Sequence, residues 1–309
     1  MTSVLSRMTT SALNLGRRGL IAQAQRRRAH GEPIGDRDRS NEGLGRTALV
    51  TGASSGIGCA TARLLAAKAY DVVVIARNMD RLMALQSELQ TRYAVGVRPL
   101  ACDLSDESAA EKICAFLDAG NVSIDLLINN AGYTMIGEFS AQPWPIHRKF
   151  VQTMALTPIE LTWRLLPGML ERGHGRIVNV ASVSAFFAGS PNMAMYSPTK
   201  SMLLKFSEGL DAECEGRGVT CTTSVPGVTE SEFFHRNNMQ QMFDTKLSAQ
   251  LWAMRPETVA RELYSAAMRG QRVIIHGWHH RAALSLLRHA PSSIQYAAAR
   301  GINGLAEAG

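Results

Sequence analysis

The chain has 309 residues, of which 46% are hydrophobic and 19% charged, and this composition excludes a disordered, collagen-like or disulfide-stapled protein. No stretch approaches the roughly 18 uninterrupted apolar residues of a transmembrane helix. The net charge is +7, but residues 1–46 hold nine arginines and four acidic residues, a balance of +5, so only +2 remains for the rest. A near-neutral body behind a basic tail gives no stripe of cations for a nucleic acid, and we expect no nucleic-acid partner.

Two features bear on the cellular compartment. The five cysteines are odd in number and form no Cys-x-x-Cys pair, which predicts free thiols in a reducing compartment and no structural zinc. Residues 1–31 contain no acidic residue but carry six arginines, which suits an organelle import signal as well as a disordered extension. We expect a cytoplasmic protein, with organelle import as the alternative. Residues 1–45 are assigned to a basic extension whose polar end, 31–45, is a linker.

From Arg46 onward, short β-rich apolar runs alternate with longer stretches of helical period. Strands are predicted at 47–50, 72–76, 97–101, 126–128, 177–180, 219–224 and 273–275. Helices are predicted near 57–69, 80–92, 106–118, 144–172, 195–216 and 257–269. Runs this apolar leave no face in water, so they indicate a parallel sheet covered by helices on both sides. We therefore predict one doubly wound α/β domain over residues 46–278, followed by a C-terminal helical extension over 279–309.

A glycine-rich turn, Thr51–Gly58, follows the first strand and opens the first helix. Here Gly52 permits the tight turn, Gly56 lets the backbone approach a pyrophosphate, and Gly58 lets helix and strand pack closely. The helix N-terminus then offers its N–H groups and the positive end of its dipole to the phosphates. The turn therefore predicts a dinucleotide site.

The end of the second strand indicates which dinucleotide binds. A free ribose 2′-hydroxyl is usually met there by an acidic residue, whereas this chain has Ala76-Arg77. The Arg77 guanidinium suits a 2′-phosphate, so we predict NADP rather than NAD. After the third strand, Asp103 is placed to accept a hydrogen bond from the adenine amino group, although it equally suits the N-cap of the next helix.

Tyr196 and Lys200 stand four residues apart at the start of a predicted helix and so share one of its faces. Lowering the pKa of a phenol by ~3 units requires ~4 kcal/mol of added stabilisation of the phenolate. A neighbouring lysine ammonium and a positive nicotinamide ring could supply it. Because a strand ending in Asn179-Val180-Ala181-Ser182 precedes this pair, we expect an acid–base site here.

Together these motifs resemble the short-chain dehydrogenase/reductase family over roughly residues 46–278. The residues that carry the resemblance are the glycine turn, Asn129-Asn130-Ala131-Gly132, Ser182, Tyr196 with Lys200, and Pro226-Gly227. The resemblance implies a single Rossmann domain with a seven-stranded parallel sheet in the order 3-2-1-4-5-6-7. It also implies hydride transfer between NAD(P) and a carbonyl or alcohol, and a homo-oligomer.

The resemblance also assigns roles by position. Tyr196 would be the general acid or base, Lys200 would lower its pKa and hold the nicotinamide ribose, and Ser182 would hydrogen-bond the substrate oxygen. The residues expected to bind the cofactor are Gly52, Ser54, Ser55, Gly56, Ile57, Gly58, Arg77, Asp103, Asn129, Ala131, Gly132, Tyr196, Lys200, Pro226, Gly227 and Thr229.

The chain departs from the family pattern at two places. The family's helix asparagine, which anchors a water in the proton relay, falls on Met154, and methionine cannot hold that water. Ser182 lies fourteen residues before Tyr196, one more than the family pattern, so Ser184 stays open as an alternative for the serine role.

Apolar residues after Ser182 and after Pro226-Gly227 predict a hydrophobic substrate wall, although they equally suit a core or a dimer face. These residues are Phe186, Phe187, Met193, Phe233, Phe234, Met239 and Met242. Beyond the last strand lie His276, His279 and His280, without an accompanying carboxylate or cysteine, so we expect no metal site. We place these histidines on the wet side of an amphipathic helix that suits a membrane surface or a partner subunit.

The sequence thus predicts an NADP(H)-dependent oxidoreductase of a small hydrophobic carbonyl or secondary alcohol. The alternative is a nucleotide-binding protein with weakened catalysis that acts as a sensor or interaction partner. Met154 is the only residue that supports this alternative. An epimerase or dehydratase of nucleotide sugars shares the fold, but only 109 residues follow Lys200, which is short for a separate sugar-binding lobe.

Overall fold

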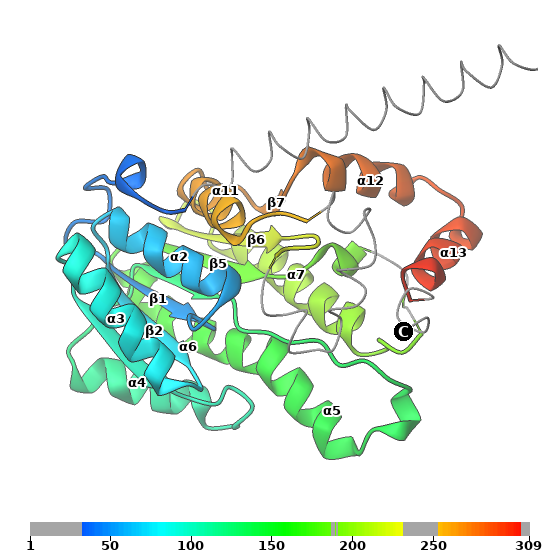
Figure 1. Ribbon diagram of the computed structural model, residues 1–309, viewed down its shortest axis with the longest axis horizontal. Coiled ribbons are helices and arrows are strands. Elements are labelled where there is room, and N and C mark those ends of the chain that lie inside the picture. The colour runs from blue at the N-terminus through cyan, green and yellow to red at the C-terminus, as the bar shows by residue number, and fades with distance from the viewer. Residues whose placement is uncertain (1–32, 187–188, 190, 231–252, 304–309) are drawn as a thin grey trace, which may run out of the picture.

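The computed structural model describes residues 33–186, 189, 191–230 and 253–303 (Figure 1). Its centre is a seven-stranded, all-parallel sheet in the order β3-β2-β1-β4-β5-β6-β7. The strands are β1 (Thr47–Thr51), β2 (Asp71–Ala76), β3 (Val97–Ala101), β4 (Leu126–Asn129), β5 (Gly175–Val180), β6 (Val219–Val225) and β7 (Val273–Ile275). Each predicted strand is present, with ends shifted by two residues at most, and the predicted order is confirmed.

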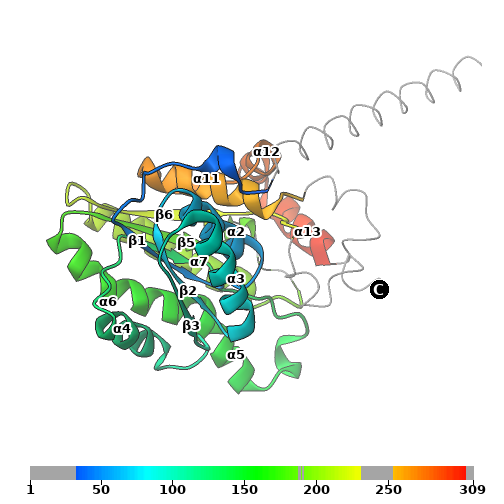
Figure 2. The ribbon, with the colours of Figure 1, turned by 60° about the vertical axis from the view of Figure 1, so that its left-hand side comes forward.

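Helices cover both faces of the sheet, as Figure 2 shows. One face carries α2 (Gly56–Ala67), α3 (Met79–Tyr93) and α11 (Pro256–Met268), and the other carries α4 (Ala109–Ala119), α6 (Thr157–Glu171) and α7 (Tyr196–Glu213). Each face has its own buried apolar cluster, because strand residues that alternate along the chain point to opposite faces. The predicted doubly wound α/β architecture is therefore confirmed.

The chain reverses its winding direction between β1 and β4, which are neighbours in the sheet. Strands β2 and β3 extend the sheet on one side of this pair, and β5, β6 and β7 extend it on the other. In open parallel sheets, ligands bind beyond the carboxyl ends of the strands at such a switch point. The topology thus places a binding crevice next to the glycine turn that follows β1.

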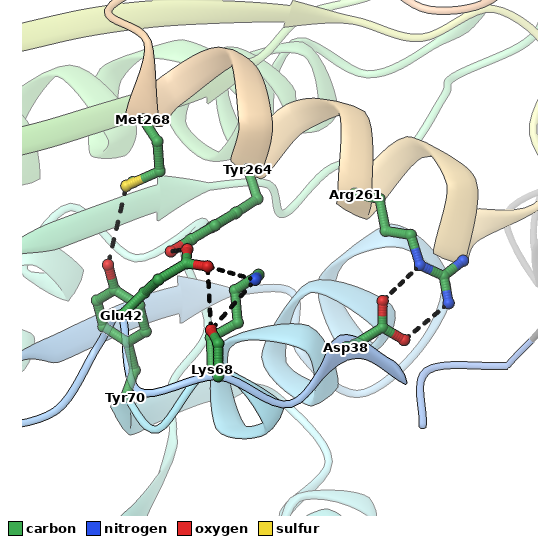
Figure 3. A network of polar contacts seen from close by, with 8 residues as sticks. Asp38, Glu42, Lys68, Tyr70, Arg261, Tyr264 and Met268 are labelled. Carbon is green, nitrogen blue, oxygen red and sulfur yellow. Dashed lines mark hydrogen bonds and ion pairs between the residues drawn. The ribbon is translucent and has the colours of Figure 1, made fainter. Parts of the chain in front are cut away.

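The segment 33–45, which the sequence assigned to a linker, packs against the domain instead (Figure 3). Asp38 makes a two-pronged ion pair with Arg261 of α11, at 2.8 and 3.0 Å. Glu42 accepts a hydrogen bond from the Tyr264 hydroxyl at 2.7 Å and pairs with Lys68 at 3.0 Å. We call residues 33–45 the N-terminal strap. The folded unit therefore begins before Arg46, and the predicted boundary needs this correction.

The helix predicted over 144–172 is interrupted. It consists of α5 (Trp144–Val151), a π-helical turn η3 (Gln152–Leu156) and α6. Inside the turn, the Gln152 amide donates to the Thr157 hydroxyl, which in turn donates to the Leu104 carbonyl. π-turns frequently occur at functional sites, and this one carries Met154.

The C-terminal extension consists of α12 (Trp278–Arg288) and α13 (Ser292–Asn303). The prediction that the three histidines lie on its wet side is wrong, because His276, His279 and His280 are all buried. Both ring nitrogens of His276 are used: Nδ1 contacts Glu262 at 2.9 Å and Nε2 contacts the Ser224 hydroxyl at 2.8 Å. Within the described residues, none of the helices combines the length and apolar character needed to cross a bilayer.

Candidate active site

A cavity of about 960 Å³ lies beyond the carboxyl ends of six strands, at the switch point. Its wall contains the residue after each of these strands or close to it: Gly52, Arg77, Cys102, Asn130, Ala181 and Pro226. Every predicted catalytic or cofactor residue lines this cavity except Gly58 and Asn129. The structure thus brings residues 177 positions apart, Gly52 and Thr229, into one site.

The glycine turn can be built only from glycine at two of its positions. Gly52 has φ +68°, and a Cβ there would lie 2.8 Å from the Ala131 Cα. A Cβ on Gly58 would lie 2.3 Å from the Gly52 carbonyl oxygen. Gly58 therefore acts by packing α2 against the turn and does not face the cavity. This close approach brings the N-terminus of α2 to the cavity wall.

The N-terminus of α2 keeps its capacity to bind an anion. The N-cap residue Ser55 makes no side-chain capping hydrogen bond to the first helical N–H groups. Such N–H groups, at the positive end of the helix dipole, bind phosphate readily. With Ser54, Ser55 and Gly56 in the cavity wall, this end of the cavity fits the pyrophosphate of a dinucleotide.

Asn130 and Thr51 hold the strand β4 loop against the turn. The Thr51 hydroxyl accepts from the Asn130 and Ala131 N–H groups at 3.0 and 3.1 Å, and the Asn130 amide donates to the Thr51 carbonyl at 3.0 Å. Asn130 also lines the cavity, whereas Asn129 does not. The Asn129 amide points into the protein and donates to Asn179 at 2.9 Å, so the expectation that Asn129 contacts the cofactor needs correction.

The far end of the cavity carries two cations. Arg77 follows β2 and is exposed, and Arg81 lies one turn into α3, whose N-cap Asn78 accepts a hydrogen bond from the Arg81 N–H. Arg81 was missed in the sequence, although its spacing of four from Arg77 was the available signal. Asp103 also lines this end and accepts from the Ser105 N–H. Because α4 begins only at Ala109, Asp103 is not its N-cap.

Tyr196 begins α7 and reaches Ser182 at the end of β5. Burial raises the pKa of Tyr196, and the hydrogen bond with the Ser182 hydroxyl offsets this only in part. The Ser182 hydroxyl also accepts from the Ser184 N–H at 3.2 Å. Ser184 itself is absent from the cavity wall, and its buried hydroxyl has no hydrogen-bond partner among the described residues. The geometry therefore favours Ser182 over Ser184.

Lys200 lies one turn beyond Tyr196 and is buried. Its Nζ donates to the Val180 carbonyl at 2.8 Å, and burial lowers the pKa of Lys200 to about 8. The sequence predicted that Lys200 would lower the pKa of Tyr196. In the protein without a cofactor, burial raises the pKa of Tyr196. The predicted lowering by Lys200 together with a bound nicotinamide ring stays a prediction.

Met154 stands at the position where the family pattern has a helix asparagine. A Cβ on Gly132 would lie 3.2 Å from the Met154 Sδ and 3.7 Å from the Lys200 Nζ. The Tyr133 N–H donates to the Met154 Sδ at 3.3 Å. The thioether thus fills the corner between Gly132 and Lys200, with a weak acceptor where the family places an amide. Lys149 and Thr153, which the sequence did not reveal, line the wall next to it.

The segment 226–229 follows β6 and packs against the buried ring of His280, which in turn contacts His276. The Val183 N–H donates to the Pro226 carbonyl at 3.0 Å, which ties this segment to the loop after Ser182. The His280 ring packs on Gly227, where a Cβ would lie 2.3 Å from its Cε1 and Nε2 atoms. The His280 Nδ1 contacts the His276 carbonyl at 2.9 Å. These contacts set the position of the segment over the cavity.

The predicted hydrophobic wall is only partly described. Phe186 and Met193 are both half-buried, and neither lines the cavity. The other residues of this prediction, Phe187, Phe233, Phe234, Met239 and Met242, lie outside the described residues. Tyr133, Leu104 and Ile57 supply further apolar surface to the cavity wall.

Comparison with known proteins agrees with this geometry. The family model described as short chain dehydrogenase matches residues 46–242. A short chain dehydrogenase of Pseudocercospora fijiensis is 38% identical over 194 residues, covering 61% of this chain and 61% of that protein. A serine 3-dehydrogenase of Rhizobium radiobacter is 38% identical over 193 residues, covering 60% of this chain and 73% of that protein.

Among solved structures, a short-chain dehydrogenase from Sphingobium yanoikuyae in complex with NADPH has a TM-score of 0.70 and 28% identity. The match covers 81% of the present chain and 94% of the Sphingobium yanoikuyae chain. The match of the family model, the sheet order and the residues gathered around the cavity agree with one another. The chain therefore belongs to the short-chain dehydrogenase/reductase family of NAD(P)-dependent oxidoreductases.

Proposed function

We propose that the protein transfers hydride between NADP(H) and a hydrophobic carbonyl or secondary alcohol, with Tyr196 as the acid–base residue. The observation that carries this proposal is that Ser182, Tyr196 and Lys200 share one cavity wall with the uncapped N-terminus of α2 and with Arg77. One end of the cavity suits phosphates and the other offers a proton donor.

The cavity residues fit a dinucleotide along its length. The turn residues Gly52 and Ser54–Gly56 would hold the pyrophosphate, and Arg77 with Arg81 would hold a 2′-phosphate. Asp103 would meet the adenine, and the segment 226–229 would cover the nicotinamide. When bound, the cofactor supplies or accepts the hydride.

The protein's own residues handle the proton. The Ser182 hydroxyl would orient the substrate oxygen, and Tyr196 would donate its proton to that oxygen as the carbonyl is reduced. The Tyr196 phenol is neutral at neutral pH, which is the form that donates a proton in the reductive direction. Burial raises its pKa, so this donation depends on stabilisation of the phenolate that it leaves. The Lys200 ammonium would stabilise the resulting phenolate and hold the nicotinamide ribose.

The hydrophobic substrate is supported by the apolar side chains of Met154 and Tyr133 in the wall beside Lys200. Serine 3-dehydrogenase, one of the relatives, is named for a polar substrate, so polar hydroxy acids form the competing class. A panel of aliphatic ketones, aldehydes, acyl thioesters and polar hydroxy acids separates the two classes. Preference for the polar compounds would contradict the hydrophobic assignment.

The test of the catalytic role is NADPH oxidation with the best carbonyl of that panel. We expect Tyr196→Phe to lower turnover by a factor of about 10²–10⁴ and to change NADPH affinity far less than turnover. Tyr296→Phe, at an exposed tyrosine on α13, serves as the matched control and should retain full activity. Turnover that survives in Tyr196→Phe would remove Tyr196 from the mechanism.

A second candidate function follows from Met154. Its buried thioether cannot position a water as an amide does, so proton delivery could be slow enough for the protein to act as a nucleotide-dependent sensor or interaction partner. In that case NADPH would bind with normal affinity while no carbonyl of the panel is reduced. Met154→Asn would then raise turnover of the enzyme.

A further inference from the structure

The two C-terminal helices form a surface that the catalytic proposal does not use. We call residues Trp278–Asn303, which comprise α12 and α13, the C-terminal hairpin. Its 26 residues contain no aspartate or glutamate and carry three arginines, Arg281, Arg288 and Arg300. All formal charge on this stretch is therefore positive, whereas the domain body is near neutral.

Large apolar side chains are exposed on the same hairpin. Their exposed fractions are 60% for Trp278, 77% for Leu286, 52% for Ile294 and 60% for Tyr296. The buried side of α12 is taken by His279, His280 and Leu284, so Trp278 and Leu286 project from the outside of the fold. Two of these four side chains are amphipathic aromatics, the type enriched where protein meets the membrane interface.

Helix α13 is little packed by the residues that the structure describes. Of its side chains at 292–297, only Gln295 is even half-buried. An isolated helix of this length is marginal in water, and helices in proteins are stabilised chiefly by packing of an apolar face. The described part of the chain thus leaves Ile294 and Tyr296 uncovered.

The charge of the hairpin decides which surface fits. A contact between the hairpins of two copies would bring together two surfaces whose formal charge is positive only, which is unfavourable. Anionic lipid headgroups attract each arginine by about 1 kcal/mol, while the acyl boundary accepts the apolar side chains. We propose that the C-terminal hairpin docks on an anionic lipid bilayer.

The hairpin also packs against the back of the cavity wall, because the His280 ring of α12 lies on Gly227. Helix α12 starts three residues after β7 and packs against η4 (Val183–Phe186), the turn that follows Ser182. Figure 1 shows α12 and α13 along one end of the molecule, on the side opposite α3. A bilayer bound to the hairpin would lie beside the substrate end of the cavity. This relation to the substrate rests on the proposed function, whereas the docking on a bilayer does not.

The test is co-sedimentation of the full-length protein with vesicles of phosphatidylcholine alone or mixed with phosphatidylserine, without cofactor or substrate. We expect binding to the mixed vesicles only, and a loss of binding as salt rises from about 0.1 M to about 1 M. The triple variant Leu286→Glu/Ile294→Glu/Tyr296→Glu should reduce the partition coefficient by more than about tenfold, because each change removes an apolar anchor and adds a repelled charge. Arg281→Glu should weaken binding by about fivefold to tenfold.

The control is a matched triple variant at exposed apolar residues elsewhere, Leu44→Glu/Met79→Glu/Met83→Glu, which should bind vesicles as the parent does. NADPH binding and the thermal melt report whether each variant is folded, and Arg281→Glu alone keeps the test valid if the triple variant unfolds. Vesicle binding that persists in both hairpin variants would overturn the proposal, because the arginine-rich residues 1–31 are unchanged in them. A hairpin-dependent dimer without vesicle binding would overturn it as well. Absence of turnover would contradict only the proposed reaction.

Discussion

Gly227 offers a sharp test of how the segment over the cavity is positioned. A Cβ added at Gly227 would lie 2.3 Å from two atoms of the His280 ring, more than 1 Å inside the ordinary contact distance of 3.4 Å. The ring has little freedom to retreat, because it is buried, contacts the His276 carbonyl and packs against the tilted His279 ring with centroids 4.1 Å apart. Overpacking of this kind costs about 1–3 kcal/mol.

We therefore expect Gly227→Ala to lower the free energy of unfolding by about 1–3 kcal/mol and to weaken NADPH binding, because the strained segment lines the cavity. His280→Ala should restore both quantities in the double variant, with a coupling energy above about 1 kcal/mol. Denaturant unfolding and titration of NADPH fluorescence measure the two effects.

The control is Gly209→Ala on α7, where a Cβ meets no atom within 4 Å. That variant should be neutral or more stable by up to about 1 kcal/mol, since alanine has the higher helix propensity. The reasoning would be refuted if Gly227→Ala behaved like Gly209→Ala, or if the effects of Gly227→Ala and His280→Ala were additive.

Three further predictions concern charge. Burial lowers the pKa of Lys200 to about 8, so the lysine is an ammonium below that pH. NADPH affinity should therefore fall as the pH rises through about 8. A constant affinity from about pH 7 to about pH 9.5 would contradict a role of the Lys200 ammonium in holding the cofactor. Arg77→Asp should reverse the preference for NADPH over NADH in a paired titration, whereas unchanged affinities would assign the 2′-phosphate to Arg81 alone. Asp38→Asn should lower the free energy of unfolding at pH 7 by about 1–3 kcal/mol, measured by denaturant unfolding. Arg261→Leu and the double variant complete a double-mutant cycle, and additive effects of the two substitutions would exclude coupling between Asp38 and Arg261. Burial raises the pKa of Asp38 but the Arg261 and Gly35 hydrogen bonds outweigh it, so this stabilisation is complete above the unfolded-state pKa of 3.8 and is lost as the pH falls through the lower folded-state pKa.

The sequence predicted the sheet well because each strand is a short apolar run between turn residues, a signal that depends only on neighbours in the chain. The glycine turn was predictable for the same reason: strand, glycines and helix are contiguous from Thr47 to Ala67. The π-turn at 152–156 escaped detection, since the hydrophobic pattern runs through it without a proline or glycine to mark it.

What the sequence could not reveal depends on partners that are distant along the chain. His276 was expected in water because a histidine on an amphipathic pattern usually is, but its buried ring is satisfied by Glu262 and by Ser224, 52 residues away. The polar strap residues Asp38 and Glu42 suggested a linker because their partners lie on α11 and at Lys68. Similarly, the pKa of Tyr196 depends on how deeply α7 is buried, which spacing alone does not report.

The N-terminal strap has a consequence for biosynthesis. Asp38 and Arg261 are 223 residues apart, and Glu42 and Tyr264 are 222 apart, so these contacts can close only after nearly the whole chain has left the ribosome. Until then, these strap residues lack their partners on α11. The contacts between the strap and α11 are thus among the last parts of the domain to assemble during synthesis.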